Sequence, residues 1–511
     1  MSRTKNSLRN VKYALFFQGL KIFITFFTRK VFVLMLTQEY LGLNGTFSNI
    51  LSMLSLAELG IGSAITYSLY KPLAERDEKQ VAARMDLFRR AYWTIGLTVA
   101  LLGACLTPFL PVLIRDLPDI PHVNLIYLLF VLNASLSYFF SYKQSLIIAD
   151  QRQYITTMCH LSLNILLQIA QALFLWFTKD FFIYLGLQIG ATLLENLILS
   201  HIADRRYPYI HSNRHDKIDP AAKKEIIKNT RAMIIHKAAG IVVFGTDNLL
   251  ISYFVGVVAV GLYSNYLMIT GALTSIYGQF FSALTASVGN LGVTSNSEQV
   301  LTVFRRLNFA GSWLYGFSAV CLAVLLNPFI ELWLGADYLF SQDIVCLIAV
   351  NFYVTGMRQA VLTFREAEGL YWYDRHKSAA ESIVNLTVSA VLAVPFGVTG
   401  IFIGTFASTM TTCFWVEPVI LFKYGLHASA KPFFRDYAVN TAITLLTFTA
   451  VWYLCEILPG TGLPLFIGKM MVCAAAGNLG YLLVYRRREE FRYFEELVLK
   501  ICRSTAKKSG S

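Results

Sequence analysis

The sequence predicts an all-α integral membrane protein with about fourteen transmembrane helices. Hydrophobic residue types make up 56% of the 511 residues and charged types only 15%, and the mean hydropathy is +0.53. Because a soluble domain carries about 25% charged residues, a soluble enzyme of this length is excluded. Very little of the chain lies outside the apolar runs, so no separate soluble domain is predicted.

Each predicted helix corresponds to an apolar run, because a helix needs about 20 mostly apolar residues to cross a bilayer. The first run follows the basic segment MSRTKNSLRNVK and has no small-residue cleavage site. It is therefore predicted to be a span and not a cleaved signal peptide. The predicted spans are 11–37, 43–69, 88–113, 122–148, 154–177, 181–203, 229–254, 259–290, 307–327, 341–364, 378–395, 398–422, 435–456 and 463–485.

The distribution of Lys and Arg predicts the topology. With the N-terminus in the cytoplasm, 35 of the 44 basic residues fall in cytoplasmic segments and two, Arg115 and Lys179, in outer loops. This is the positive-inside pattern of multi-pass membrane proteins. An odd number of spans would place the C-terminal RRRE cluster outside, so both termini are predicted to be cytoplasmic. The net charge of +13 is explained in this way, and no nucleic-acid partner is predicted.

An internal repeat divides the chain. RNVKYA (9–14) aligns with KNTRAM (228–233), and the similarity continues from 28–49 to 246–267. Such repeats are typical of secondary transporters, which bind substrate between the two halves; chance similarity between hydrophobic helices is the alternative. The predicted parts are an N-terminal six-helix bundle (1–204), a basic cytoplasmic linker (205–228), a C-terminal six-helix bundle (229–422), helices 13 and 14 (423–485) and a basic cytoplasmic tail (486–511).

No motif indicates an enzyme. The sequence has no Walker lysine loop, its eight His do not pair at metal-ligand spacing, and its eight Cys form no CxxC pair. The longest predicted outer loop is the short segment PFIELWLGADYLF (328–340). The chain is therefore predicted not to be an enzyme, and neither a cofactor nor a metal is expected.

Basic residues inside the predicted spans indicate a polar path, because such residues are costly among lipid tails. At 100° per residue, Lys21 and Arg29 lie about 80° apart on the first span, whereas Lys30 lies opposite Lys21. Lys21 and Arg29 are therefore predicted to face a cavity, to which Arg358 adds positive charge from a later span. Since arginine binds phosphate oxygens in a bidentate manner, an anionic substrate is expected. A structural ion pair is the alternative for Arg29.

Three acidic residues are predicted to act in gating or coupling. The repeat aligns Arg29 with Asp247, so this pair is predicted to close one face and to open when an anionic substrate takes over the arginine. Glu58, within LSLAELGIGSA, and Glu381 add negative charge to the spans. A role in helix packing is the alternative for Asp247 and Glu58.

Four blocks carry a resemblance to a known family: GLNGTFSNILSMLSLAELGIGSAITYSLYKPL (42–73), AVGLYSNYLMI (259–269), GMRQAVLTFREAEGLYWYDRHKSAAESIVNL (356–386) and FGVTGIFIGT (396–405). The chain resembles, over essentially its whole length, the Wzx-type polysaccharide flippases of the multidrug/oligosaccharidyl-lipid/polysaccharide exporter superfamily. The resemblance implies two six-helix bundles that form a central cavity and work by alternating access. Two further helices form a groove for the lipid tail in the related lipid II flippases.

The resemblance also implies a function. Family members move undecaprenyl-diphosphate-linked oligosaccharide repeat units from the cytoplasmic to the outer leaflet of the bacterial plasma membrane, for capsule or exopolysaccharide synthesis. Arg29 and Arg358 by motif, and Lys21 by helical facing, are expected to bind the diphosphate. Membrane lipids, a polysaccharide polymerase and glycosyltransferases of the same pathway are the expected partners. Two alternatives remain open: a drug/cation antiporter of the same superfamily, and a polyprenyl-dependent membrane glycosyltransferase or polymerase.

Overall fold

The computed structural model describes residues 3–54, 61–115, 117–212, 246–294, 297–370, 373 and 376–496. Within these residues the chain is helical and has no strand, which confirms the predicted all-α class. Eleven helical segments of the described part of the chain are long and apolar enough to cross a membrane, and each overlaps one predicted span. They are Glu78–Leu113, Val123–Ala149, Gln153–Thr178, Phe181–Arg206, Val257–Ser282, Glu298–Leu334, Gln342–Ala367, Lys377–Phe396, Val398–Gly425, Lys431–Glu456 and Gly462–Tyr485.

The other three predicted spans have different outcomes. Span 11–37 falls on α1 (Arg3–Met35), a 33-residue helix whose charged residues lower its mean hydropathy. Span 43–69 falls on α2 (Gln38–Leu54) and α3 (Ile61–Ala74), with 55–60 outside the described residues. Most of span 229–254 is also outside them. The count of fourteen therefore stays a prediction.

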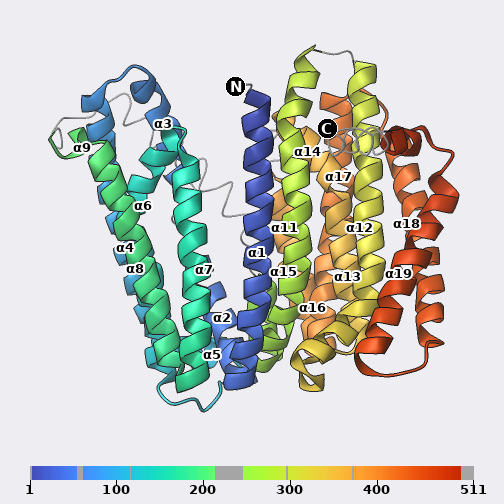
Figure 1. Cartoon of the computed structure of the whole chain (residues 1–511), viewed down its shortest axis with the longest axis horizontal. Helices are drawn as coiled ribbons and strands as arrows, with labels where there is room; N and C mark the ends of the chain where they lie inside the picture. The colour runs from blue at the N-terminus through green and yellow to red at the C-terminus, as the bar shows by residue number, and fades with distance from the viewer. Residues whose placement is uncertain are drawn as a thin grey trace, which may run out of the picture. The chain divides into compact units, whose positions relative to one another are not determined.

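The chain forms two compact units, residues 1–264 and 265–511. In the first unit, α6 packs against both α4 and α8, and α7 packs against α1 and α8 (Figure 1). Its apolar core joins side chains of α4, α6 and α8 with Tyr207 and Ile210. The predicted division at 205–228 stays a prediction. The helices of this unit not yet bounded are α4 (Glu78–Leu106), α5 (Leu110–Leu113), α6 (Val123–Ala149), α7 (Gln153–Thr178), α8 (Phe181–Arg206) and α9 (Tyr209–Ser212).

In the second unit, α18 and α19 pack against each other and against α12 (Figure 1). Two π-helical turns, Thr409–Cys413 and Leu421–Gly425, flank the short helix α17, and such turns are frequent at functional sites. The helix α11 (Val257–Thr294) begins in the first unit. The others are α12 (Ser297–Leu334), α13 (Gln342–Met357), α14 (Gln359–Ala367), α15 (Lys377–Phe396), α16 (Val398–Ser408), α17 (Phe414–Ile420), α18 (Lys431–Glu456) and α19 (Gly462–Tyr485).

The three glycines of the block FGVTGIFIGT (396–405) allow a turn and a close helix contact. Gly397 turns the chain between α15 and α16 with a φ of 56°, a conformation that residues with a Cβ rarely adopt. Gly400 and Gly404 then bring the two helices into close contact, because a Cβ at Gly404 would lie 2.5 Å from the Ser389 nitrogen. Small residues four positions apart are a common device for close helix packing in membranes.

Replacing Gly404 with Ala is expected to separate α15 from α16 and to destabilise the second unit. The added methyl group would overlap Ser389, and overpacking of this kind costs about 1–3 kcal/mol. Thermal unfolding in detergent would show a lower melting temperature. Gly190→Ala is the matched control, since a Cβ there would have no atom within 4 Å apart from those of its chain neighbours and its own helix backbone. Equal melting temperatures for the two variants would contradict the close contact.

Candidate functional site

Helices α1 and α7 face each other through polar side chains in the first unit. On each helix the polar residues fall within an arc of about 80–100° at 100° per residue, and the two helices pack together. This arrangement is called the polar seam below. Its residues are Lys21, Thr25, Thr28 and Arg29 of α1, and His160, Asn164, Gln168 and Gln171 of α7.

Hydrogen bonds hold the middle of the polar seam together. The Thr25 hydroxyl donates to the Gln168 side-chain oxygen at 3.0 Å, and the Thr28 hydroxyl reaches the same oxygen at 3.4 Å. The Gln168 amide nitrogen donates to Asn164 at 2.7 Å along α7. These contacts set the register of the two helices and place Arg29 beside Gln171.

Arg29 lies in an open pocket of about 620 Å³ formed by α1, α2, α7 and α8. Polar side chains supply amide groups, and apolar side chains surround them. A pocket with a few convergent polar groups in an otherwise apolar wall is the usual form of a ligand site. The lining residues are Thr25, Thr28, Arg29, Phe32, Leu41, Asn44, Gln168, Gln171, Ala172, Leu175 and Tyr184.

The Arg29 guanidinium donates one hydrogen bond, to the Ser264 hydroxyl on α11 at 3.1 Å. Among the described residues it has no carboxylate within ion-pair distance, although Asp247 is described. Arg29 is half-buried, and a guanidinium removed from water without a neutralising carboxylate is costly. An anionic ligand would remove this cost, so the pocket is suited to bind an anion.

Lys21 lies at the other end of the polar seam, beside the pair of His160 and Glu195. The His160 Nδ1 atom lies 3.1 Å from the Glu195 Oε1 atom, joining α7 to α8, and Lys21 interacts electrostatically with His160. Lys21 and Arg29 thus lie along one face of α1, two turns apart. No spacing in the sequence pointed to His160, because its partner is 35 residues away.

The second unit contains a buried cluster of charges centred on Glu417 in α17. Arg358 binds this carboxylate through two hydrogen bonds, from Nε at 2.9 Å and from Nη2 at 2.7 Å. Lys377 also binds Glu417, and Arg365 lies 3.8 Å from it. Glu381 lies 3.5 Å from Arg358. The Glu417 carboxylate is fully buried, so this set of ion pairs ties α14, α15 and α17 together.

The two predicted arginines therefore have different surroundings. Arg358 is engaged by Glu417 and Glu381, and an anion could bind it only by displacing a carboxylate. Arg29 is engaged by a neutral hydroxyl. The predicted substrate role of Arg358, and that of Glu381 in coupling, stay predictions.

The remaining predicted residues lie elsewhere. Glu58 is outside the described residues. Asp247 is half-buried and interacts electrostatically with Tyr263 of α11. Lys143, a further basic residue within the predicted span 122–148 to which no role was assigned, is buried and bound to Asp204 at 2.6 Å, so it is a structural residue of the first unit.

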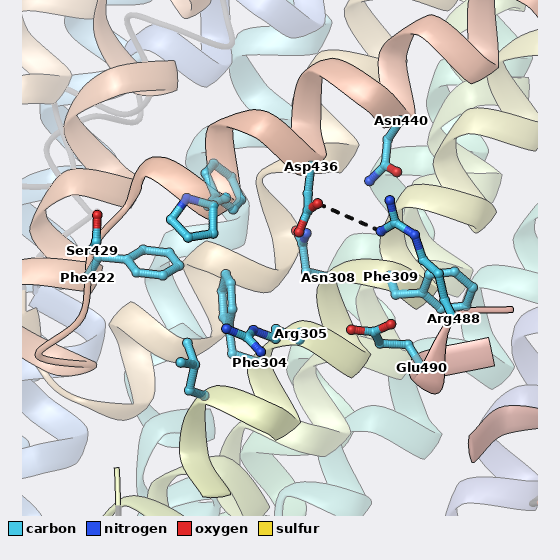
Figure 2. Close-up of a pocket in the computed structure, with 13 residues that line it drawn as sticks. Phe304, Arg305, Asn308, Phe309, Phe422, Ser429, Asp436, Asn440, Arg488 and Glu490 are labelled. Atoms are coloured by element: carbon cyan, nitrogen blue, oxygen red, sulfur yellow. Dashed lines mark ion pairs between the residues drawn. The ribbon is translucent and has the colours of Figure 1, made fainter. Parts of the chain in front are cut away.

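A separate polar pocket lies in the second unit where α12 and α18 meet the segment after α19 (Figure 2). Arg305 and Arg488 line it together with Asp436 and Glu490, and the Arg488–Asp436 ion pair measures 3.8 Å. Its two positive and two negative side chains balance, so it lacks the net positive charge of the Arg29 pocket.

Comparisons with known proteins place this geometry in context. A sequence profile described as "Polysaccharide biosynthesis protein" matches residues 7–285, more than half of the chain. No curated protein sequence matches. The structure of the lipid II flippase MurJ in an inward closed conformation is 14% identical, with 91% of this chain and 99% of that chain covered and a TM-score of 0.59. An inward-facing multidrug resistance transporter of the MATE family, MOP superfamily, is 12% identical, with 78% and 94% covered and a TM-score of 0.59. The chain therefore has the fold of these multi-pass membrane transporters.

Replacing Glu417 with Gln is expected to destabilise the protein by about 3–5 kcal/mol, the cost of leaving buried charges without their partner. Arg358, Arg365 and Lys377 would lose their shared carboxylate. Thermal unfolding in detergent would report the change as a lower melting temperature. Glu331→Gln, at an exposed position of α12, is the control and should melt like the unmodified protein. A Glu417→Gln protein as stable as this control would contradict the structural role of the cluster.

Proposed function

The chain belongs to the polysaccharide biosynthesis protein family, and from that premise we propose that it is a flippase for undecaprenyl-diphosphate-linked oligosaccharide repeat units. The single observation that carries this proposal is the Arg29 pocket, where a guanidinium without a carboxylate partner among the described residues meets amide side chains. The diphosphate supplies the missing negative charge. The transport step breaks no covalent bond, so the protein is not an enzyme.

The chemistry of the pocket matches a charged sugar carrier. Arg29 forms charge-assisted hydrogen bonds to diphosphate oxygens, and its planar fork favours two parallel bonds. Asn44 and Gln171, which line the same pocket, offer amide donors and acceptors for sugar hydroxyls. Lys21 adds positive charge along the polar seam, and Arg358 is a further diphosphate contact in a state where Glu417 has moved away.

The lipid tail requires a different surface. An apolar pocket of about 900 Å³ lies in the second unit between α12, α13, α16 and α18, and Val320, Val354 and Phe406 are among its lining residues. A polyprenyl chain can make only apolar contacts, and the lining of this pocket is mostly apolar. The headgroup and the lipid tail thus bind to chemically distinct surfaces. The headgroup site has alternating access to each side of the membrane.

A drug or cation antiporter is the second candidate, and it is favoured by the structural similarity to the MATE transporter. A cationic substrate requires an acidic pocket, whereas the pocket around Arg29 is lined by a cation and neutral amides. The anionic substrate therefore agrees better with the residues described. A polyprenyl-dependent glycosyltransferase or polymerase requires an acid or base at the substrate, and none lines this pocket.

The proposal includes a location and partners. The positive-inside distribution of basic residues supports a multi-pass membrane protein with both termini in the cytoplasm. The proposed undecaprenyl-linked substrate places it in the bacterial plasma membrane. Glycosyltransferases would supply the lipid-linked repeat unit on the inner leaflet, and a polysaccharide polymerase would consume it on the outer leaflet.

Replacing Arg29 with Ala is expected to slow flipping about tenfold to a hundredfold, the equivalent of one or two charge-assisted hydrogen bonds. Proteoliposomes carrying a fluorescent undecaprenyl-diphosphate-linked disaccharide and an impermeant quencher would measure the rate. Arg29→Lys should restore it only in part, because the fork geometry is lost. Arg435→Ala, at an exposed site of α18, is the control. Full activity of Arg29→Ala would show that Arg29 does not bind the substrate.

Asp247 is proposed to replace Ser264 as the partner of Arg29 when the outer side closes. Asp247→Asn is then expected to favour the outward-open state, and the exchange Arg29→Asp with Asp247→Arg to restore closure without transport. Labelling of a Thr37→Cys site by an impermeant maleimide would report the opening, with Asp119→Asn in an exposed loop as control. Unchanged labelling in Asp247→Asn would leave Asp247 as a packing residue.

A further inference from the structure

The pair of His160 and Glu195 is a titratable group between α7 and α8 that the proposed substrate contacts do not use. The His160 Nδ1 atom on α7 lies 3.1 Å from the Glu195 Oε1 atom on α8, and both helices are candidate membrane spans. Ionisable residues at such positions are rare and are usually functional. Histidine is the side chain whose charge changes most readily between about pH 5 and 8.

The geometry defines where a proton would bind. A carboxylate only accepts hydrogen bonds, so the His160 Nδ1 atom that faces Glu195 must carry a hydrogen. The Nε2 atom is then the basic atom of the neutral ring and takes up the additional proton. The His160 side chain is 55% exposed, so this atom can be reached, while Glu195 is only 22% exposed.

The charges around His160 come from each helix packed against α7. Lys21 approaches from α1, and its charge opposes that of a protonated His160, whereas Glu195 from α8 favours it. On α7 itself, the Cys159 thiol interacts electrostatically with Glu195. On α6, Lys143 donates hydrogen bonds to Asp204 and Ser200.

We propose that His160 is a proton-binding site whose occupancy sets the positive charge of the polar seam, so that proton binding and anion binding favour each other. This inference rests on the proposed function, because it places the bound anion at Lys21 and Arg29, the two cationic residues at the ends of the polar seam. With His160 protonated, the imidazolium neutralises Glu195, and the charge of Lys21 acts on the anion. With His160 neutral, Glu195 attracts Lys21, and the anion loses that contribution.

The proposal predicts the direction in which anion affinity changes with pH, because linked binding is reciprocal. Anion affinity is high at low pH, where His160 is protonated, and falls as the pH rises. His160→Gln removes the proton site and holds the seam in its low-affinity state at every pH. Glu195→Gln removes the competing carboxylate and holds the seam in its high-affinity state, even at high pH. Purely structural damage would lower affinity in both variants.

Two measurements on the full-length protein in nanodiscs test the inference. In the first, histidine-selective NMR compares the unmodified protein with His160→Gln, and the signal lost in the variant should titrate between about pH 5 and 8. In the second, binding of undecaprenyl diphosphate is measured at pH 5.5 and pH 8. The ratio of the affinity at pH 5.5 to the affinity at pH 8 should be at least about fivefold larger in the unmodified protein than in His160→Gln. Protonation of the ligand itself affects both proteins equally, so it cancels when the two ratios are compared.

His201→Gln, an exposed position further along α8, is the matched control and should keep the pH dependence of the unmodified protein. A His160 signal that does not titrate in this range, or a His160→Gln protein with an unchanged affinity ratio, would overturn the inference. Low affinity of Glu195→Gln at pH 8 would also overturn it. Failure of the unmodified protein to bind undecaprenyl diphosphate at either pH would contradict the proposed function and the linkage, while the NMR titration would still decide whether His160 binds a proton.

Discussion

The free energy needed to remove a charge from water is the constraint that shapes both units. A charged side chain between apolar helices requires an opposite charge, several hydrogen bonds or a ligand. In the second unit the requirement is met internally, since Glu417 is surrounded by Arg358, Lys377 and Arg365. In the first unit Arg29 receives only a hydroxyl partner among the described residues. The same constraint thus produces a structural cluster in one unit and a candidate anion site in the other.

The polar seam shows how the constraint acts on helix packing. Without a hydrophobic driving force between helices in lipid, side-chain hydrogen bonds and close packing determine which faces meet. Gln168 accepts from Thr25 and donates to Asn164, so the register of α1 against α7 is fixed by polar groups and not by apolar packing alone. The cationic residues of α1 are positioned as a consequence of that register.

The sequence predicted what depends on local pattern. Hydropathy located the eleven candidate membrane-spanning helices among the described residues, and helical periodicity indicated that Lys21 and Arg29 share a face. The sequence could not predict the partners of these charges. Glu417 lies 59 residues from Arg358 and 40 from Lys377, and His160 lies 35 residues from Glu195, so no spacing rule connects them. Such pairs depend on which helices are neighbours, and a single sequence does not supply that information.

The contrast between the two arginines also bears on the transport cycle. A carrier must bind its substrate firmly enough to take it up and weakly enough to release it on the other side. Arg358 already has a bidentate carboxylate partner, so binding a diphosphate there first requires the Arg358–Glu417 contact to break. Binding of the proposed anion at Arg29 would replace only one neutral hydrogen bond, the one to Ser264, which is a far smaller rearrangement. A site of this kind can be filled and emptied repeatedly, and a modest change in nearby charge is enough to shift the balance between the two states.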